Sequence, residues 1–113
     1  MYAAALAELG FSVLGEGAFE GDEYVLFGRD GNDDFSLHSV GSESGRDRAT
    51  SGVHVAFTAS DAAAVDRWHR VALDHGATDN GPPGRRPEYT GDYYAAFVLD
   101  LDANNVEAVF HTP

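Results

Sequence analysis

Apolar and polar residues alternate over residues 53–58, where two valines and a phenylalanine are separated by histidine, alanine and threonine. A period of two is typical of a strand with one buried face. Apolar runs at 93–99 and 105–111 predict two further strands, joined by a turn at 100–104. The segment 80–91, NGPPGRRPEYTG, is predicted to be a loop because its three prolines and three glycines disfavour regular structure.

A helical period follows the first of these strands. Between residues 62 and 75 apolar side chains recur every three or four positions, with Ser60 or Asp61 as the cap and Gly76 as the end. The buried side of this helix is predicted to consist of Ala64, Val65, Trp68, Val71 and Ala72. In the first forty residues we expect a short helix over 1–9 and strands at 11–14, 20–27 and 35–40.

The two halves of the chain have the pattern of related units. The predicted order is α-β-β-β over residues 1–40, a Gly- and Ser-rich linker over 41–52, and β-α-β-β over 53–113, with a weak extra strand near 77–79. One helix and a few strands cannot close a core alone, so we expect the halves to share one. The sequence therefore predicts a single α+β domain over residues 1–113, with helices on the outer face of a curved sheet.

The charge balance is strongly acidic. The chain has 19 Asp and Glu against 7 Arg and no Lys, so the formal net charge is −12. This surface repels a phosphate backbone, which argues against nucleic acid as a partner, and it resembles the surfaces of halophilic proteins.

The absence of cysteine excludes disulfides and thiolate sites. No apolar run has membrane-spanning length and no signal-peptide pattern is present, so we expect a cytoplasmic protein without a membrane partner.

His54 and Glu107 are the strongest candidates for chemistry. Each lies on a predicted strand and points away from its apolar neighbours. If the apolar sides pack on the helices, both polar side chains point into the concave side of the sheet, where an imidazole and a carboxylate form half of a metal site. The alternative is a hydrogen-bonded core histidine and an unrelated glutamate.

The segments GVHVAFTASDAAAVDRWH and YYAAFVLDLDANNVEAVFH resemble the vicinal-oxygen-chelate superfamily, which includes glyoxalase I, bleomycin-resistance proteins and extradiol dioxygenases. The most specific part is D-x-D-x-N-N-x-E, which runs from Asp100 to Glu107. The resemblance implies two paired βαβββ modules that form a cupped mixed sheet around a divalent metal ion. It also implies that the first module lacks its opening strand.

By this resemblance, His54 matches the metal ligand on the first strand of the second module and Glu107 the ligand on its last strand. The other family ligands come from the first module, whose last strand here carries Ser36 at the usual glutamate position. His38, on the same face as Ser36, is the expected substitute, and His111 is a further candidate. The alternative for both is a solvated or hydrogen-bonded side chain. The implied cofactor is a divalent nickel, zinc, iron or manganese ion.

The proline-rich segment is expected to form the rim of the cleft. Arg85 and Arg86 are two of only seven cations, and arginine beside tyrosine suits a carboxylate or phosphonate on a small substrate. The alternative is that these arginines pair with surface aspartates. Tyr89 and Tyr94 are the tyrosines expected to bind substrate, and Tyr94 is preferred to Tyr93 as the one that faces the cleft.

These residues lead to two functional hypotheses. In the first, the protein is a lyase or dioxygenase whose divalent ion binds two adjacent oxygens of a small substrate, while Glu107 also moves a proton. In the second, the same fold binds or sequesters a small molecule without metal. Because the missing strand leaves an exposed sheet edge and family members commonly dimerise, we also expect a homodimer.

Overall fold

The computed structural model describes residues 1–19, 22–39, 50–87 and 92–112. The chain divides into two compact units: Met1–Leu9 with Ser51–Pro113, and Gly10–Thr50. Most of the predicted linker lies outside the described residues. None of the helices in the described part is long and apolar enough to cross a membrane.

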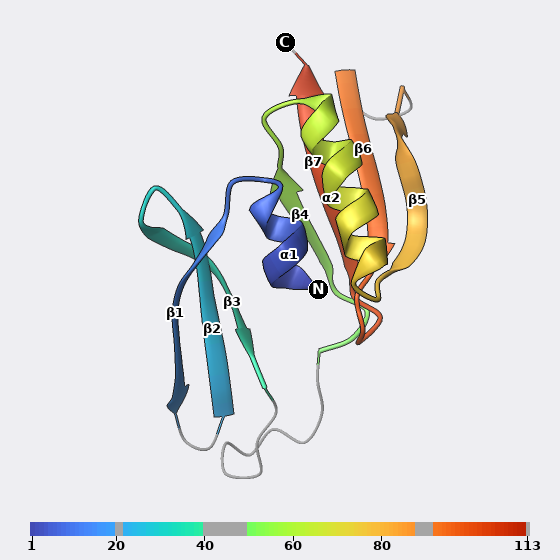
Figure 1. Cartoon of the computed structure of the whole chain (residues 1–113). Helices are drawn as coiled ribbons and strands as arrows, with labels where there is room; N and C mark the ends of the chain where they lie inside the picture. The colour runs from blue at the N-terminus through green and yellow to red at the C-terminus, as the bar shows by residue number, and fades with distance from the viewer. Residues whose placement is uncertain (20–21, 40–49, 88–91, 113) are drawn as a thin grey trace. The chain divides into compact units, whose positions relative to one another are not determined.

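The larger unit contains a four-stranded mixed sheet, drawn in green to red in Figure 1. Its strands lie in the order β4-β7-β6-β5, with β4 parallel to β7 and the other pairs antiparallel. The bounds are β4 His54–Thr58, β5 Thr78–Arg85, β6 Asp92–Leu99 and β7 Asn105–Thr112. The two inner strands carry the most completely buried side chains of the sheet, among them Val98 and Val106.

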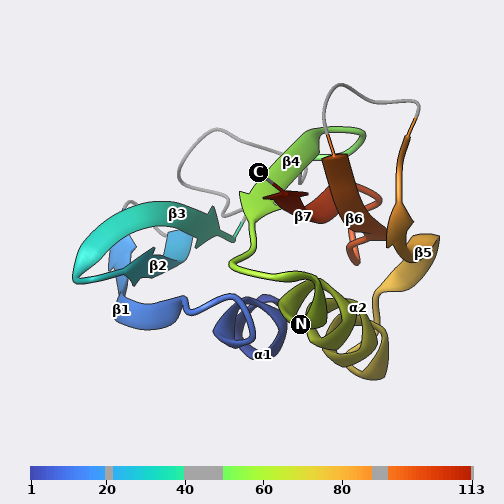
Figure 2. The ribbon, with the colours of Figure 1, turned by 90° about the horizontal axis from the view of Figure 1, so that it is seen from above.

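One helix covers one face of this sheet. Helix α2, Ala62–Asp74, lies along β5, β6 and β7, and the view from above in Figure 2 shows α2 and α1 together on one side of the strands. Asp61 caps it by accepting a 2.8 Å hydrogen bond from the backbone N–H of Ala64. Gly76 follows it with φ +103°, a conformation that favours glycine. The cap and the end of the helix follow the sequence pattern. Four of the predicted residues are buried, whereas Val71 is only half-buried and His69 is buried in addition.

The N-terminal helix α1, Tyr2–Ala7, belongs to the larger unit, where it packs on α2. Glu8 accepts a 3.2 Å hydrogen bond from Arg67 of α2. The hydroxyl of Tyr2 donates a 2.5 Å hydrogen bond to Asp100, in the turn before β7. Two polar contacts therefore hold the first residues of the chain to segments far along the sequence.

The smaller unit is an antiparallel sheet of three strands in the order β1-β2-β3. Their bounds are β1 Ser12–Phe19, β2 Asp22–Arg29 and β3 Asn32–His38. Asp30 and Gly31, both with positive φ, form the tight turn between β2 and β3, as a two-residue hairpin requires. β1 extends beyond the strand predicted at 11–14 and runs through Gly15 and Gly17. A Cβ on Gly17 would lie 2.5 Å from the hydroxyl of Tyr24, so glycine leaves room for that ring.

The α+β class predicted from the sequence is confirmed. Within the described residues, β3-β2-β1 repeats the antiparallel order β7-β6-β5 but has no equivalent of β4. This arrangement agrees with a first module that lacks its opening strand.

The prediction that residues 80–91 are entirely loop is wrong, because 78–85 form strand β5. Within the described residues β5 is an edge strand that pairs only with β6, and Pro82 and Pro83 lie between the paired residues Gly81 and Gly84, where the register with β6 shifts. Two register shifts, on either side of Gly81, accommodate the prolines. The position at the edge of the sheet overrides the local tendency of proline and glycine to break structure.

Candidate functional site

The face of the four-stranded sheet turned away from α2 carries the candidate residues, and we call it the site face. Tyr94 on β6 donates a 2.6 Å hydrogen bond to Asp66 of α2, so Tyr94 lies on the helix side. Because successive side chains of a strand point to opposite faces, Tyr93 and Phe97 lie on the site face. Phe97 is paired in register with Glu107, which brings Glu107 onto the same face.

His54 and Glu107 meet on this face, as the sequence pattern predicts. Nε2 of His54 lies 2.6 Å from Oε1 of Glu107, although the two residues are 53 positions apart in the chain. The parallel pairing of β4 with β7 places them together, since Ala56 is opposite Glu107 and His54 is on the same side as Ala56. The Glu107 side chain is 4% exposed and the His54 side chain 53% exposed. An accessible imidazole is thus held by a buried carboxylate.

The second oxygen of the Glu107 carboxylate also has a donor. The hydroxyl of Tyr93 donates a 2.5 Å hydrogen bond to Oε2. A buried carboxylate without partners is strongly disfavoured, and here each of its oxygens has one. Which of Nε2 and Oε1 donates in the contact between His54 and Glu107 depends on the tautomer of the histidine.

The floor around these polar groups is apolar. Ala95, Phe97 and Val109 form a buried cluster, and the Tyr93 ring packs against it. The ring centroids of His54 and Phe97 are 6.3 Å apart. His111 meets Tyr93 edge-on at 5.0 Å. The site face therefore combines a hydrogen-bonded His–Glu–Tyr group with an aromatic and aliphatic surface, a combination suited to binding a small organic molecule.

The structure reverses the sequence-based choice between the two neighbouring tyrosines. Tyr94 was expected to face the cleft, but this prediction is wrong, because its hydroxyl is bound to Asp66 on the helix side. The hydrogen bond to Asp66 also raises the pKa of Tyr94. Tyr93 is the one that reaches Glu107. Tyr89 lies outside the described residues.

The chain matches no family model and no curated protein, whereas several solved structures are similar to it. A glyoxalase/bleomycin resistance protein from Albidiferax ferrireducens is 24% identical, with 97% of this chain and 85% of that one covered and a TM-score of 0.73. A glyoxylase/bleomycin resistance protein/dioxygenase domain from Frankia is 15% identical over 96% and 84% of the two chains, with a TM-score of 0.64. The trypanothione-dependent glyoxalase I of Leishmania major is 16% identical over 93% and 72%, with a TM-score of 0.57.

The chain has the glyoxalase/bleomycin-resistance fold. The fold that the sequence resemblance implied is therefore confirmed. In this chain of 113 residues, α2 lies on one side of the four-stranded sheet and the His54–Glu107 pair lies on the other.

The side-chain atoms of His54 and Glu107 are of the kinds that bind a divalent metal ion. An imidazole nitrogen and a carboxylate oxygen are ligands that nickel, zinc, iron and manganese accept, and here the two atoms lie 2.6 Å apart. Tyr93 fixes the carboxylate from behind, the role that outer hydrogen bonds have around metal ligands. Within the described residues, no group of three or more His, Asp and Glu side chains is close enough to hold a metal. The pair thus fits as two ligands of a metal site.

His38, the predicted third ligand, lies on β3 in the smaller unit. Its Nε2 is 3.2 Å from the hydroxyl of Ser36, and its ring is 5.9 Å from that of Tyr24. His38 is exposed, so its imidazole is accessible. Its role as a ligand stays a prediction from the sequence.

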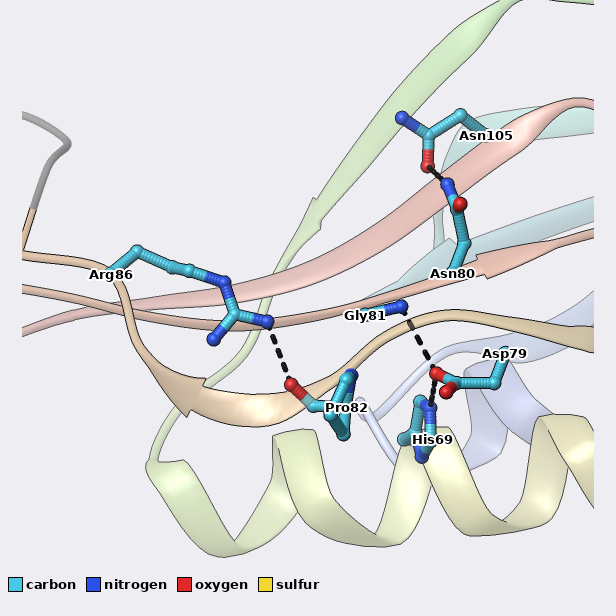
Figure 3. A network of polar contacts seen from close by, with 7 residues as sticks. All are labelled: His69, Asp79, Asn80, Gly81, Pro82, Arg86 and Asn105. Atoms are coloured by element: carbon cyan, nitrogen blue, oxygen red, sulfur yellow. Dashed lines mark hydrogen bonds and ion pairs between the residues drawn. The ribbon is translucent and has the colours of Figure 1, made fainter.

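A second histidine–carboxylate pair has a structural role. His69 of α2 is buried, and its Nε2 lies 2.9 Å from Oδ1 of Asp79 at the start of β5 (Figure 3). The same oxygen accepts a 3.0 Å hydrogen bond from the N–H of Gly81. Both hydrogen bonds lower the pKa of Asp79, and the one from Gly81 has the larger effect. The pair joins the helix to the edge strand on the side away from the site face.

Proposed function

We propose that this protein binds a small molecule with two adjacent oxygen atoms on the site face, with a divalent metal ion held by His54 and Glu107. The observation that carries the proposal is the convergence of His54 Nε2 and Glu107 Oε1, from strands far apart in the chain, on an otherwise apolar face. Nickel, zinc, iron and manganese are the candidate ions, and His38 is the candidate third ligand.

The residues of the site have distinct roles in this proposal. A bound ion acts as a Lewis acid toward an oxygen of the substrate. His54 supplies one ligand nitrogen, and its exposed ring leaves the position open to solvent and substrate. Glu107 supplies an oxygen, and its carboxylate is also the group proposed to accept or return a proton in a lyase reaction. Tyr93 keeps Oε2 of Glu107 in place while Oε1 faces His54.

The apolar cluster supports a second candidate function, a metal-free protein that binds or sequesters a small molecule. Ala95, Phe97 and Val109 form a buried apolar cluster beside the polar group, and the partly buried Tyr93 ring packs against it. Both oxygens of Glu107 have hydrogen-bond donors from the chain itself, so the buried carboxylate needs no ion for its stability. In this case His54 and Tyr93 would orient a ligand through hydrogen bonds.

Calorimetric titration with Ni²⁺, Zn²⁺, Mn²⁺ and Fe²⁺ distinguishes the two functions. The metal-dependent function requires about one ion per site, with binding abolished by His54→Ala. His75→Ala is the matched control, because His75 lies at the end of α2 with its Nδ1 2.9 Å from the carbonyl of Val71. The same titration of His38→Ala tests the third ligand. Absence of saturable binding by the four ions would contradict the metal-dependent function and leave the metal-free one.

A further inference from the structure

A single arginine side chain is seated in a space that two glycines leave open. A Cβ on Gly81 would lie 3.1 Å from the Phe97 ring and 3.5 Å from Nη2 of Arg86, and a Cβ on Gly84 would lie 3.1 Å from Nη1 of Arg86. Gly81 also has φ +146°, which side chains rarely adopt. We call this space, bounded by Gly81, Gly84, Pro82 and Phe97, the guanidinium cradle.

The chain holds the guanidinium of Arg86 in this cradle at several points. Nη2 donates a 2.7 Å hydrogen bond to the carbonyl of Pro82, as Figure 3 shows. The central carbon lies 5.5 Å from the centre of the Phe97 ring, within the range of a cation–π contact. The backbone N–H of Arg86 donates a 2.6 Å hydrogen bond to the carbonyl of Tyr93, so its Cα is fixed to β6. Much of the ordering cost of this long side chain is therefore met before any ligand arrives.

The contacts of Arg86 within the described residues are to backbone carbonyls and an aromatic ring, with no carboxylate among them. By contrast, Arg67 is bound to a carboxylate, that of Glu8. In a chain of net charge −12, a fixed arginine without a carboxylate partner in this part of the structure is a notable feature. The Arg86 side chain has five N–H donors, and the carbonyls of Pro82 and Arg85 accept from two of its nitrogens, so further donors are available to a ligand.

The cradle is next to the candidate site. The Phe97 ring that contacts Arg86 also lies 6.3 Å from the ring of His54. The site face therefore has a fixed positive charge at Arg86 and the His54–Glu107 pair, both beside the aromatic ring of Phe97. Phe97 is 9% exposed, so a ligand that reaches the exposed part of its ring is near both the arginine and the imidazole.

We propose that Arg86 is the anion-binding group of this site and that its ligand is a small aromatic carboxylate. This inference rests on the proposed function, because it assigns the substrate class to the same face. The carboxylate pairs with the guanidinium, the ring lies against Phe97, and an adjacent oxygen reaches His54 and Glu107. The planar fork of arginine matches the two oxygens of a carboxylate.

Salicylate and salicylamide provide a matched pair of probes. Both carry a phenolic hydroxyl beside a carbonyl oxygen on a benzene ring, and they differ in charge. Binding is measured by calorimetry and by NMR shifts, in the metal-loaded and the metal-free protein. We expect the native protein to bind salicylate at least about tenfold more tightly than salicylamide, since hydrogen bonds to charged groups are strong.

Three variants test whether Arg86 causes this preference. Arg86→Gln should remove this preference, and Arg86→Lys, which keeps the charge but loses the fork, should retain part of it. Arg85→Gln is the matched control. Arg85 was also a candidate from the sequence, but it is exposed and paired in register with Tyr94, on the helix side of the sheet, so this variant should keep the full preference. Gly84→Ala should weaken salicylate binding by displacing the guanidinium from its cradle.

The failures are distinguishable. If both probes bind equally well, or if Arg86→Gln and Arg86→Lys keep the full preference, the assignment of Arg86 is overturned while the proposed function stands. If neither probe binds in either form while His54-dependent metal binding persists, the aromatic carboxylate is overturned as the ligand and the proposed function stands. If metal binding is also absent, the metal-dependent function falls with it. The comparison of the two probes on the native protein decides the ligand class even if the glutamine variant does not fold.

Discussion

The hydroxyl of Tyr93 and the carboxylate of Glu107 are joined by a 2.5 Å hydrogen bond across two neighbouring antiparallel strands. This bond occupies the one carboxylate oxygen that His54 does not reach. It makes Tyr93 a positioning residue for the candidate site, since it controls which oxygen of Glu107 is directed at the imidazole.

Tyr93→Phe is predicted to destabilise the fold and to weaken metal binding. Removing the hydroxyl leaves a buried acceptor without its donor, which costs about 1–3 kcal/mol in the free energy of unfolding. Urea denaturation measures that cost, and calorimetry with Ni²⁺ or Zn²⁺ measures the affinity, which should fall about tenfold or more, as for other outer-sphere groups.

Tyr94→Phe is the matched control for this prediction. It removes a hydrogen bond of similar length, to Asp66, at the adjacent position on the opposite face of β6. Metal affinity should not change in this variant. Equal losses of affinity in the two variants would show that Tyr93 has no specific relation to the site.

The contact between His69 and Asp79 predicts a pH-dependent stability. Hydrogen bonds from Gly81 and His69 hold the pKa of Asp79 below its ordinary value of 3.8. A carboxylate with a lowered pKa in the folded state stabilises the fold above the unfolded-state pKa, and this contribution disappears as the pH falls through the folded-state pKa. The Tm of Asp79→Asn should therefore be lower than that of the native protein at neutral pH.

This difference in Tm should shrink as the pH is lowered below about 4, where the native carboxylate takes up a proton. Thermal unfolding followed by circular dichroism from pH 7 to about pH 2.5 checks it. Asp74→Asn provides a control at an exposed position near the end of the same helix. A difference between native and Asp79→Asn that stayed constant over the whole range would contradict the assigned role.

The net charge of −12 predicts that salt stabilises the protein. Like charges repel in the compact state, and at about 1 M salt the screening length falls to about 3 Å. Tm should therefore rise steadily between roughly 0.05 and 1 M NaCl, with most of the rise at the low-salt end. Sucrose, which carries no charge, serves as the control for effects of excluded solute. A Tm that is flat or falling with NaCl would argue against the halophilic interpretation.

The three-stranded sheet leads to a prediction about assembly. Within the described residues, β3 has no partner on the side where β7 pairs with β4 in the other sheet. An exposed edge of this kind is a template for pairing with another chain, so we expect a homodimer. Light scattering coupled to gel filtration should give twice the 12.1 kDa mass of the chain. A monomer mass at both low and high salt would contradict this expectation.

Local patterns were sufficient for helix α2 and for the directions of His54 and Glu107. The cap at Asp61, the glycine after the helix and the buried stripe around Trp68 depend on neighbouring residues alone. The alternation of side chains along a strand likewise depends on one strand, which is why the pattern places His54 and Glu107 opposite their apolar neighbours.

Other features depend on which strands are neighbours, and these only the tertiary structure decided. Strand β5 exists despite its prolines because it lies at the edge of a sheet, where half of its backbone groups need no partner. Tyr93, and not Tyr94, reaches Glu107 because the register of β6 with β7 determines the face each tyrosine occupies. The cradle of Arg86 forms where Gly81 of β5 is paired with Phe97 of β6. No local pattern in the sequence brings these two segments together.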